Sequence, residues 1–165
     1  MVNKEKLMKV DDLAGSAIEG GKELADLALE ATQFLQWHRW CKKVLCGYFD
    51  RGWPGVLAIF YFEIETSTRM ADSDLWVIVG DLPPAYLDVA SCPNGAIALE
   101  SYVDAMQDWV DHVNAKQPLE DVIPVYRRHS FVRVKPASEY AKDLEGRLNF
   151  IRIRILPDYE EELKE

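Results

Sequence analysis

Two strongly apolar segments with a polar segment between them constrain the fold of this chain more than any other feature. Residues 56–65 read VLAIFYFEIE and residues 75–80 read LWVIVG, and both are rich in β-branched and aromatic side chains. Each is too short to be read as an ordinary core helix, and the intervening TSTRMADSD, residues 66–74, has the polarity of a loop. The pattern predicts two buried, antiparallel neighbouring strands joined by a hairpin loop.

Residues 96–114, AIALESYVDAMQDWVDHVN, carry the clearest helical pattern. Their apolar residues recur at three-and-four spacing and form one stripe: Leu99, Tyr102, Val103, Met106, Trp109, Val110 and Val113. The opposite side is acidic: Glu100, Asp104, Asp108 and Asp111. We therefore expect an amphipathic helix with an acidic outer face, and Asn94 or Ser91 can cap its start.

Residues 22–48 also follow helical spacing, and Gly52 and Pro54 end the pattern. One unbroken helix of this length is unusual in a compact domain, so we expect a kink or break around Thr32. The preceding residues 1–21 hold three glycines and no aromatic residue, and we interpret them as a short, loosely held helix followed by a break.

Near the C-terminus, two short segments carry a positive charge at every second residue. The first is 131–135, with Arg133 and Lys135, and the second is 149–155, with Arg152 and Arg154. Their apolar residues alternate with these cations, which is the period of a strand. We predict two strands of one sheet, with a short helix over Ser138 to Leu144 between them that ends near Gly146, and with all four cations on the sheet face away from the helices.

These elements predict an α+β fold: an antiparallel sheet of about four strands with helices packed on one face. The length of 165 residues fits a single domain over 1–165, long enough to bury a proper core. Within it, residues 1–21 are expected to be loosely ordered and 157–165 to form an acidic tail. The sequence shows no internal repeat and no linker that would mark a second domain.

The four cations have two interpretations. Glu63 and Glu65 share one face of the first apolar strand, and they are expected to lie opposite the arginines in ion pairs. Alternatively, these residues form a ligand-binding surface for an anion or an acidic partner, because guanidinium groups bind carboxylate and phosphate bidentately. The ion-paired interpretation is the simpler one, since the glutamates already supply partners.

Five tryptophans are many for this length. Trp76 lies inside a predicted strand and Trp109 lies in the apolar stripe of a predicted helix, so both are expected in the core. Trp37 and Trp40 cannot both face inward along with the neighbouring apolar residues, so one of them is a candidate interface residue. This surplus, with the long helical region, predicts a homodimer that uses helix faces.

Side chains that support catalysis or metal binding are present but are not arranged in a known motif. His38, Cys41 and Cys46 lie within one short segment, but structural zinc sites use paired short spacings that this segment lacks. Pairings of Cys92 with His112 or His129 are not specified by any local pattern. We therefore predict no catalytic residue, no metal ligand and no cofactor.

The segment GDLPPAYL, residues 80–87, is predicted to belong to a loop and to have a structural role. Gly80 ends the second apolar strand, the two prolines stiffen the exit, and Tyr86 and Leu87 are expected to pack back on the core. It is not a phosphate loop, since it has one glycine, no following lysine, and prolines that remove backbone donors. Asp81 could act as an acid or base, but an aspartate after glycine is foremost a turn residue.

The composition excludes some classes of partner. A net charge of −9 and a pI near 4.9 disfavour nucleic-acid backbones and anionic membrane surfaces. The longest apolar run, Val56 to Phe62, is too short to span a bilayer, and the first residues do not have the pattern of a secretory signal. Three cysteines fit free thiols better than a disulfide framework. The expected location is the cytoplasm.

The segment LWVIVGDLPPAYL, followed by the ALESYVDAMQDWV helix and a short Pro-Val segment, resembles a pattern in small uncharacterised bacterial proteins, a domain family of unknown function. The resemblance covers roughly Gly55 to Val125. It implies a cytoplasmic bacterial domain and carries over no activity and no catalytic residue.

The leading functional hypothesis is a non-enzymatic module that binds another protein. Small, acidic domains without catalytic motifs include toxin-neutralising immunity proteins, and this parallel is one of analogy. The alternative is a protein that binds a small anionic ligand, or an enzyme. Either would use the basic sheet face or the GDLPP loop. A ligand-sized cavity with convergent polar groups would favour the alternative, and a flat patch rimmed by aromatic residues would favour the first.

Overall fold

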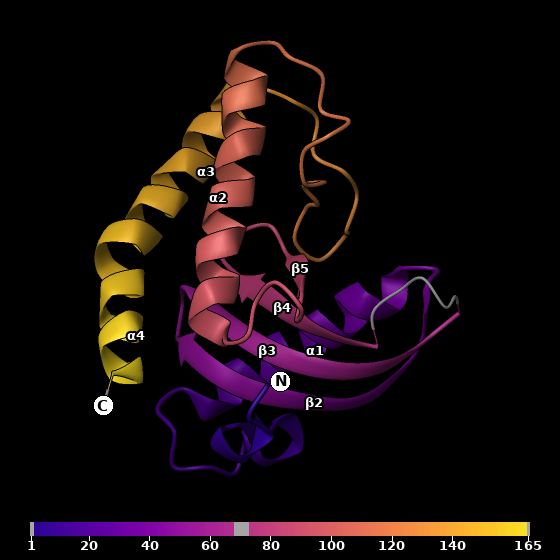
Figure 1. Ribbon diagram of the computed structural model, residues 1–165, viewed down its shortest axis with the longest axis vertical. Coiled ribbons are helices and arrows are strands. Elements are labelled where there is room, and N and C mark those ends of the chain that lie inside the picture. The colour runs from indigo at the N-terminus through magenta and orange to yellow at the C-terminus, as the bar shows by residue number, and fades with distance from the viewer. Residues whose placement is uncertain (1, 68–72, 165) are drawn as a thin grey trace.

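A computed structural model describes residues 2–67 and 73–164 of the chain (Figure 1). Its elements, in chain order, are η1 (Lys4–Lys6), β1 (Met8–Lys9), η2 (Val10–Asp12), α1 (Gly21–Trp37), β2 (Cys41–Trp53), β3 (Leu57–Thr66), β4 (Asp74–Gly80), β5 (Ala85–Asp88), α2 (Gly95–Asn114), α3 (Ser138–Phe150), η3 (Ile151–Ile155) and α4 (Leu156–Leu163). No helix in the described part of the chain is long and apolar enough to cross a membrane.

The strands form one antiparallel sheet in the order β1-β2-β3-β4-β5. This confirms the predicted α+β class, and the sheet has five described strands where about four were expected. The prediction that residues 56–65 and 75–80 pair as antiparallel neighbours is also confirmed, because Leu57 pairs with Gly80 and Glu63 with Asp74. Part of the predicted hairpin loop, 68–72, lies outside the described residues.

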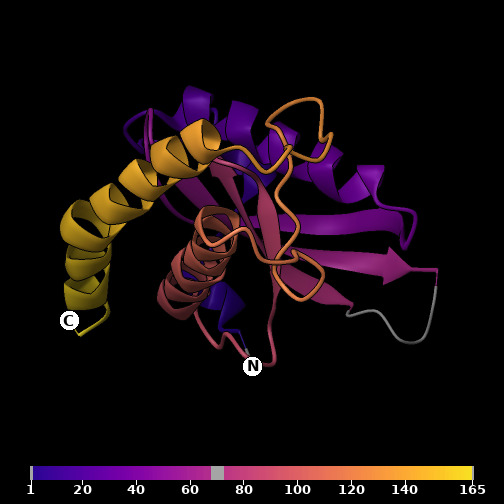
Figure 2. The same ribbon diagram turned by 90° about the horizontal axis from the view of Figure 1, so that it is seen from above.

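Helices cover both faces of the sheet, where the sequence predicted one. Figure 2 shows α1 on one side of the strands and α2 on the other, with α3 and α4 curving beside α2. Alternate residues of β3 explain this arrangement: Phe60 packs in the cluster that contains α1, while Ile59 packs in the cluster that contains α2. A strand buried on both sides needs a helix on each, since its side chains alternate.

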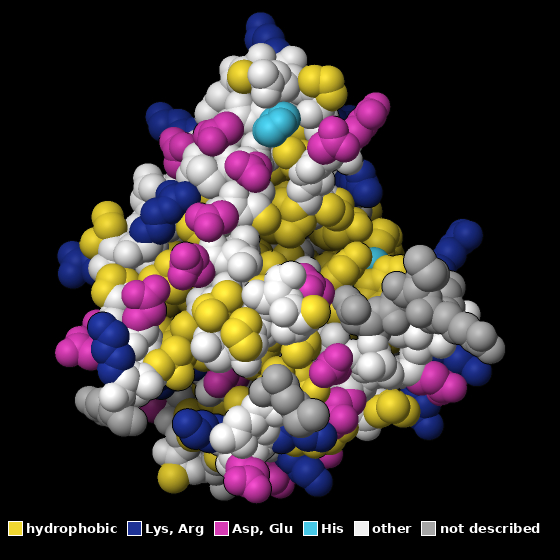
Figure 3. Space-filling model, in the orientation of Figure 1, with side chains coloured by type: hydrophobic (Ala, Val, Ile, Leu, Met, Phe, Trp, Pro, Cys, Tyr) yellow, Lys and Arg dark blue, Asp and Glu magenta, His cyan; other side chains and the backbone are white. Residues whose placement is uncertain are grey.

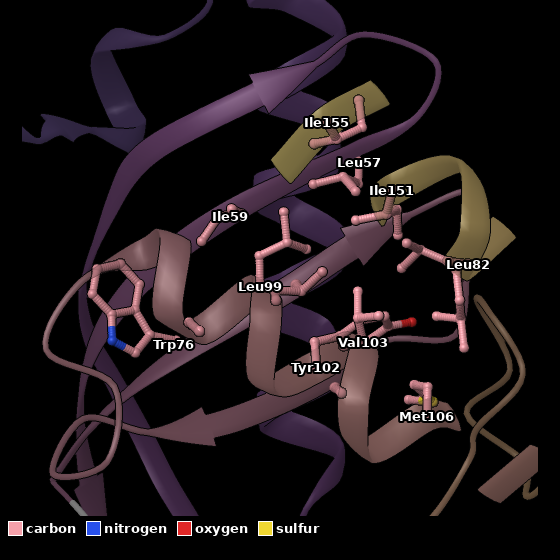
Figure 4. Close-up of a cluster of buried hydrophobic side chains, with 14 of the residues drawn as sticks. Leu57, Ile59, Trp76, Leu82, Leu99, Tyr102, Val103, Met106, Ile151 and Ile155 are labelled. Atoms are coloured by element: carbon pink, nitrogen blue, oxygen red, sulfur yellow. The ribbon is translucent and has the colours of Figure 1, made fainter. Parts of the chain in front are cut away.

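The core on the α2 side joins the sheet to all three C-terminal helical segments. In Figure 4 Trp76 lies at one end of this cluster, while Leu82 and Ile151 lie at the other, beside Leu57. The predicted stripe of the α2 helix supplies the centre: Leu99, Tyr102, Val103, Met106, Trp109 and Val110 are buried. Trp76 and Trp109 are thus core residues, as predicted, and Asn94 caps the helix by accepting a hydrogen bond from the Ile97 amide. Figure 3 shows the acidic side chains along the outer face of α2.

The prediction of a helix over 22–48 is wrong in its second half. The helix ends at Trp37, where His38 takes an extended backbone conformation, and residues from Cys41 onward form β2. Strand β2 shifts register against β3 at three places, which are bulges or irregularities. Each such shift breaks the alternation of inward and outward residues, so the strand period is hidden in the sequence.

The prediction of a strand over 131–135 is also wrong. Arg133 makes one isolated bridge with Tyr126, and the segment otherwise has no regular secondary structure and follows a turn over 128–130 in the long connection between α2 and α3. Phe131 has a positive φ of 58°, which interrupts an extended strand. Its side chain is buried against α1, whereas Val132 is exposed.

The second predicted strand, 149–155, is helical. The helix α3 continues past Gly146 into the π-helical segment η3 and then into α4, as one curved rod (Figures 1 and 2). Pro157 explains the π turn, since it lacks an amide hydrogen and its ring displaces the carbonyl four residues earlier. The amide of Leu156 accordingly bonds to the carbonyl of Ile151, five residues back.

Candidate functional site

A hollow lies between α3 and the two turns that follow β2 and β4, and we call it the α3 hollow. Its volume is about 460 Å³, which lies within the range of ligand-binding pockets. Its apolar lining is Val56, Leu82, Phe150 and Ile151. Its charged lining is Asp81, Lys142, Asp143 and Arg147, and Gly55 and Gly146 complete it.

The GDLPP loop forms one wall of the α3 hollow and is held from three directions. Gly80 has a φ of 147°, and a Cβ there would stand 2.4 Å from the Val56 carbonyl oxygen, so only glycine fits. The Tyr102 hydroxyl, fully buried in α2, donates to the Pro83 carbonyl at 2.6 Å. The Arg147 Nε donates to the Asp81 carbonyl at 2.8 Å. The wall is therefore rigid, and the predicted structural role of Gly80 is supported.

The outer side of α3 and η3 forms the opposite wall and extends beyond it. Lys142, Gly146, Phe150, Ile153 and Arg154 are all exposed, and we call this set the α3 face. Their spacing of about four residues places them on one side of a helix. Figure 3 shows hydrophobic and basic side chains beside one another along the edge that these segments form. The α3 face thus combines an apolar centre with positive ends.

Gly146 lies in the interior of α3, where glycine costs about 0.5–1 kcal/mol relative to alanine. In the part of the chain that the structure describes, no atom outside the local helix lies within 4 Å of the place where its Cβ would stand. Packing therefore does not require a glycine here. Its structural effect is that the α3 hollow has no side chain at this point of its wall.

A second, smaller hollow of about 190 Å³ continues from the first along the same loop. The two share Asp81, Leu82, Asp143 and Arg147, and the second adds Pro83, Arg128, Tyr140 and Leu144. Arg147 stands at the junction, with its Nη2 3.5 Å from the Asp81 carboxylate. Burial raises the pKa of Tyr140, while the charges of Arg127 and Arg147 act against that rise.

The structure does not bring the four predicted cations onto one sheet face. Arg133 lies over the ring of Tyr126, with 5.9 Å between Cζ and the ring centroid, and Lys135 is exposed in the same connection. Arg152 lies on η3 and donates to Asn149 and to Gln107 of α2. Arg154 is exposed on η3, beside Ile153.

The two predicted acidic partners pair elsewhere. Glu63 lies 3.3 Å from the Lys4 ammonium and Glu65 lies 3.6 Å from that of Lys42. The expected ion pairs between these glutamates and the arginines of 131–135 or 149–155 are therefore wrong. The physical reason is that neither basic segment joins the sheet.

The two candidate interface tryptophans differ in exposure. Trp37 is half exposed at the end of α1, and its ring contacts those of Tyr126 and Phe131. Trp40 is partly buried, with ring centroids 4.9 Å from His38 and 5.0 Å from Tyr86. Of the pair, Trp37 has the larger surface available for an interface.

His38 is buried in a group of aromatic rings that the sequence did not reveal. Phe34, Trp37, Trp40, Tyr86 and Tyr126 surround it at centroid distances from 4.8 to 5.7 Å. Its Nδ1 lies 2.9 Å from the Phe34 carbonyl oxygen, so Nδ1 carries the proton, and the buried Nε2 has no hydrogen-bond partner among the described residues. Burial lowers the pKa of His38, so the ring is neutral at ordinary pH.

Asp50 is a partly buried titratable group, and it helps to fix the helix that follows η3. Its carboxylate accepts a hydrogen bond from the Tyr159 hydroxyl of α4, and Arg51 next to it pairs with Glu162 at 2.5 Å. Burial raises the pKa of Asp50, and the bond to Tyr159 and the Arg51 charge oppose the rise. These contacts hold the C-terminal rod against the sheet and so position the α3 face.

The cysteines and remaining histidines lie apart from the α3 hollow. Cys92 is buried with its Sγ 3.6 Å from the Ser101 hydroxyl, and burial raises the pKa of its thiol. His112 lies at the other end of the helix that begins beside Cys92, and His129 lies 3.7 Å from Glu30. Among the described residues, no three Cys, His, Asp or Glu side chains gather in a way that could hold a metal ion.

Sequence reasoning missed the α3 hollow because it assigned 149–155 to a strand and ended the preceding helix at Gly146. One signal was available: the apolar residues Leu144, Leu148, Ile151, Ile155 and Tyr159 recur at three-and-four spacing through the whole region.

No protein-family model, curated protein or solved structure matches this chain.

Proposed function

We propose that this chain is a non-enzymatic module that binds another protein, and that it does so through the α3 face and the α3 hollow. The hollow has an apolar floor and a charged rim, which is the arrangement of the central pocket in many protein interfaces. Phe150 and Ile153, 47% and 69% exposed, extend this apolar surface beyond the rim.

The single observation that carries the proposal is Gly146. A glycine in the middle of a helix lowers helix stability, and at this position neither packing nor a turn accounts for it. A side chain there would project into the α3 hollow and fill part of it. A module that receives a partner's side chain at this point has a reason for the glycine.

A second candidate is a binding protein for a small amphipathic molecule. The observation that favours it is the volume of about 460 Å³, which suits such a ligand as well as a protein side chain. The two candidates differ in what lies over Phe150 and Ile153, because a small ligand inside the hollow leaves the exposed part of the α3 face uncovered.

Photo-crosslinking separates the two. A benzoylphenylalanine is placed at Phe150 or Ile153, and at Leu45 as a control, which is also an exposed apolar position but lies on β2. The proposal expects one protein to crosslink at both α3-face positions and not at Leu45. That protein is then purified, and its affinity for the original chain and for Gly146→Gln is measured by calorimetry.

We expect Gly146→Gln to weaken this binding at least about tenfold, since the added side chain occupies the space of the partner's anchor. Circular dichroism and thermal unfolding check that the variant still folds. Equal affinities for the two chains would refute the role of the α3 hollow. Native mass spectrometry showing a bound small molecule, with no α3-face crosslink, would favour the second candidate.

A further inference from the structure

The charges at the two ends of the α3 face define what it binds. We infer that the partner presents a bulky apolar side chain with carboxylates on both sides of it. This inference rests on the proposed function and adds the chemical class of the partner segment.

Lys142 and Arg154 stand at the ends of the α3 face, with Gly146 and Phe150 between them. Both cations are exposed, and neither makes an ion pair or a hydrogen bond within the part of the chain that the structure describes. Five cations elsewhere in the chain, by contrast, each pair with a carboxylate: Lys4, Lys42, Arg51, Arg128 and Arg147. In a chain of net charge −9, two available cations that flank an apolar pocket favour an acidic partner.

The acidic groups near the α3 hollow limit where the partner's carboxylates can lie. Asp81 and Asp143 line the hollow, and Arg147 is already bonded to both residues. The two aspartates offset the charges of Lys142 and Arg147 on this lining, so the interior of the hollow gives a carboxylate no net attraction, and its apolar floor is left for the apolar side chain. The partner's carboxylates are placed outside, over Lys142 at one end and Arg154 at the other.

A second copy of this chain does not satisfy the same requirement. In a two-fold symmetric contact centred between Gly146 and Phe150, the two α3 faces run antiparallel. Lys142 of one copy would then lie against Arg154 of the other, and like charges in contact are unfavourable. The α3 face is thus suited to a different polypeptide, while the predicted homodimer would use other helix faces.

The test uses three synthetic peptides as probes on the full-length chain. The first has one phenylalanine between two Glu-Glu pairs, the second has Lys-Lys pairs instead, and the third has the Glu-Glu pairs around an alanine. Binding is followed by NMR, as changes in the chemical shifts of the backbone amides. Gly146, Phe150 and Ile153 serve as reporters. We expect the first peptide to bind at these residues, and the other two to bind at least about fivefold more weakly.

Charge reversal tests the two cations directly. Lys142→Glu and Arg154→Glu should each lower the affinity for the first peptide several-fold, because each substitution replaces an attraction to the peptide's glutamates by a repulsion. Lys135→Glu is the matched control: it changes the net charge equally at an exposed position outside the α3 hollow, and it should leave the affinity unchanged. Added salt should weaken the binding of the first peptide, so that its affinity comes closer to that of the second peptide.

Two outcomes would overturn the inference. If the basic peptide binds at the same residues as well as the acidic one, or if Lys135→Glu weakens binding as much as Lys142→Glu, the partner is not selected by these charges. If no peptide shifts these amides, the acidic–apolar class is wrong. Neither result touches the proposed function, which is decided separately by crosslinking at Phe150 and Ile153.

Discussion

Glu30 of α1 and Arg128, 98 residues further along the chain, form a bidentate ion pair. The two hydrogen bonds measure 2.9 and 3.2 Å, and the Glu30 side chain is 7% exposed while that of Arg128 is 36% exposed. The pair fastens the connection between α2 and α3 to the first helix. The next residues of this connection include His129 and Phe131, which both have a positive φ.

Because Glu30 is more deeply buried than Arg128, we predict that replacing one side chain or the other lowers the free energy of unfolding by different amounts. Arg128→Gln leaves a buried carboxylate without its partner and should lower the free energy of unfolding by about 2–3 kcal/mol, somewhat less than for a fully buried pair because water reaches the guanidinium. Glu30→Gln leaves a cation that can turn to solvent and should cost about 1 kcal/mol. Urea unfolding of both variants measures the difference, and equal costs would contradict the argument.

Gly146 and Gly80 predict opposite effects of the same substitution. Gly146→Ala should raise the free energy of unfolding by about 0.5–1 kcal/mol, since alanine is the better helix former and its Cβ meets no neighbour. Gly80→Ala should lower it by several times that amount, because its φ is positive and the Cβ would overlap the Val56 carbonyl and the Leu57 Cα.

The binding measurement completes the prediction for Gly146. The more stable Gly146→Ala variant should bind the acidic phenylalanine peptide more weakly than the original chain, since its methyl group narrows the α3 hollow. A variant that gains stability without losing affinity would show that the glycine does not serve binding.

His38 predicts a loss of stability in mild acid. Burial lowers its pKa in the folded chain below the ordinary value near 6.5, so the unfolded chain binds the proton first as the pH falls. Its contribution is fully present above about pH 6.5 and declines below it, by at most about 1.4 kcal/mol per pH unit. Unfolding free energies measured from about pH 7.5 to 5 should show this slope.

Two variants assign the slope to His38. His38→Asn keeps a donor that can reach the Phe34 carbonyl but does not titrate, so this part of the pH dependence should disappear even if the variant is less stable overall. His112→Asn removes a histidine that bonds the Asp108 carbonyl outside the aromatic group and serves as the control. An unchanged slope in His38→Asn would show that another group is responsible.

The sheet centre and the α2 helix could be predicted from the sequence because one local period dominates in each. Residues 57–62 are apolar without interruption and become a strand buried on both faces, and the stripe of α2 keeps its spacing for nineteen residues in 96–114. Tyr86 and Leu87 pack on the core as expected, although β5 itself was interpreted as part of a loop.

The C-terminal rod could not be predicted from five residues alone. In IRIRI, Ile151 and Ile155 are buried but Ile153 is 69% exposed, so the alternation that resembles a strand is produced by one solvent-exposed isoleucine. The helical period appears only when Leu144, Leu148 and Tyr159 are included.

The candidate site depends on contacts between segments far apart in sequence, and local patterns do not contain these. Asp81 and Arg147 are 66 residues apart and meet only because Tyr102 and the β4 strand fix the GDLPP loop against α3. Sequence reasoning singled out Asp81 but not Arg147, which precedes the basic segment 149–155. It gave no means of placing one beside the other.

The predicted homodimer is tested at Trp37. With a half-exposed ring at the end of α1, this residue should anchor a contact between helix faces if the chain pairs with itself. We expect light scattering at tens of micromolar to give the mass of a dimer, and Trp37→Ser to give that of a monomer. A monomeric original chain would contradict the prediction and would leave the α3 face unaffected.

The last prediction concerns Asp81→Asn. It tests whether the Asp81 carboxylate contributes to stability or instead lowers the affinity of the α3 hollow for an acidic peptide. The carboxylate lies 3.5 Å from the Arg147 Nη2, and both side chains are well exposed, so the loss of this pair should change stability by less than about 0.5–1 kcal/mol. The hydrogen bond from the Arg147 Nε to the Asp81 carbonyl uses the backbone and is kept. The substitution removes a negative charge from the rim of the α3 hollow and releases Arg147, so affinity for the acidic phenylalanine peptide should rise a few-fold. Asp121→Asn, an exposed position outside the α3 hollow, controls for the change in net charge and should leave the affinity unchanged. A fall in affinity of an order of magnitude in Asp81→Asn, with the fold intact, would instead make Asp81 a direct contact of the partner.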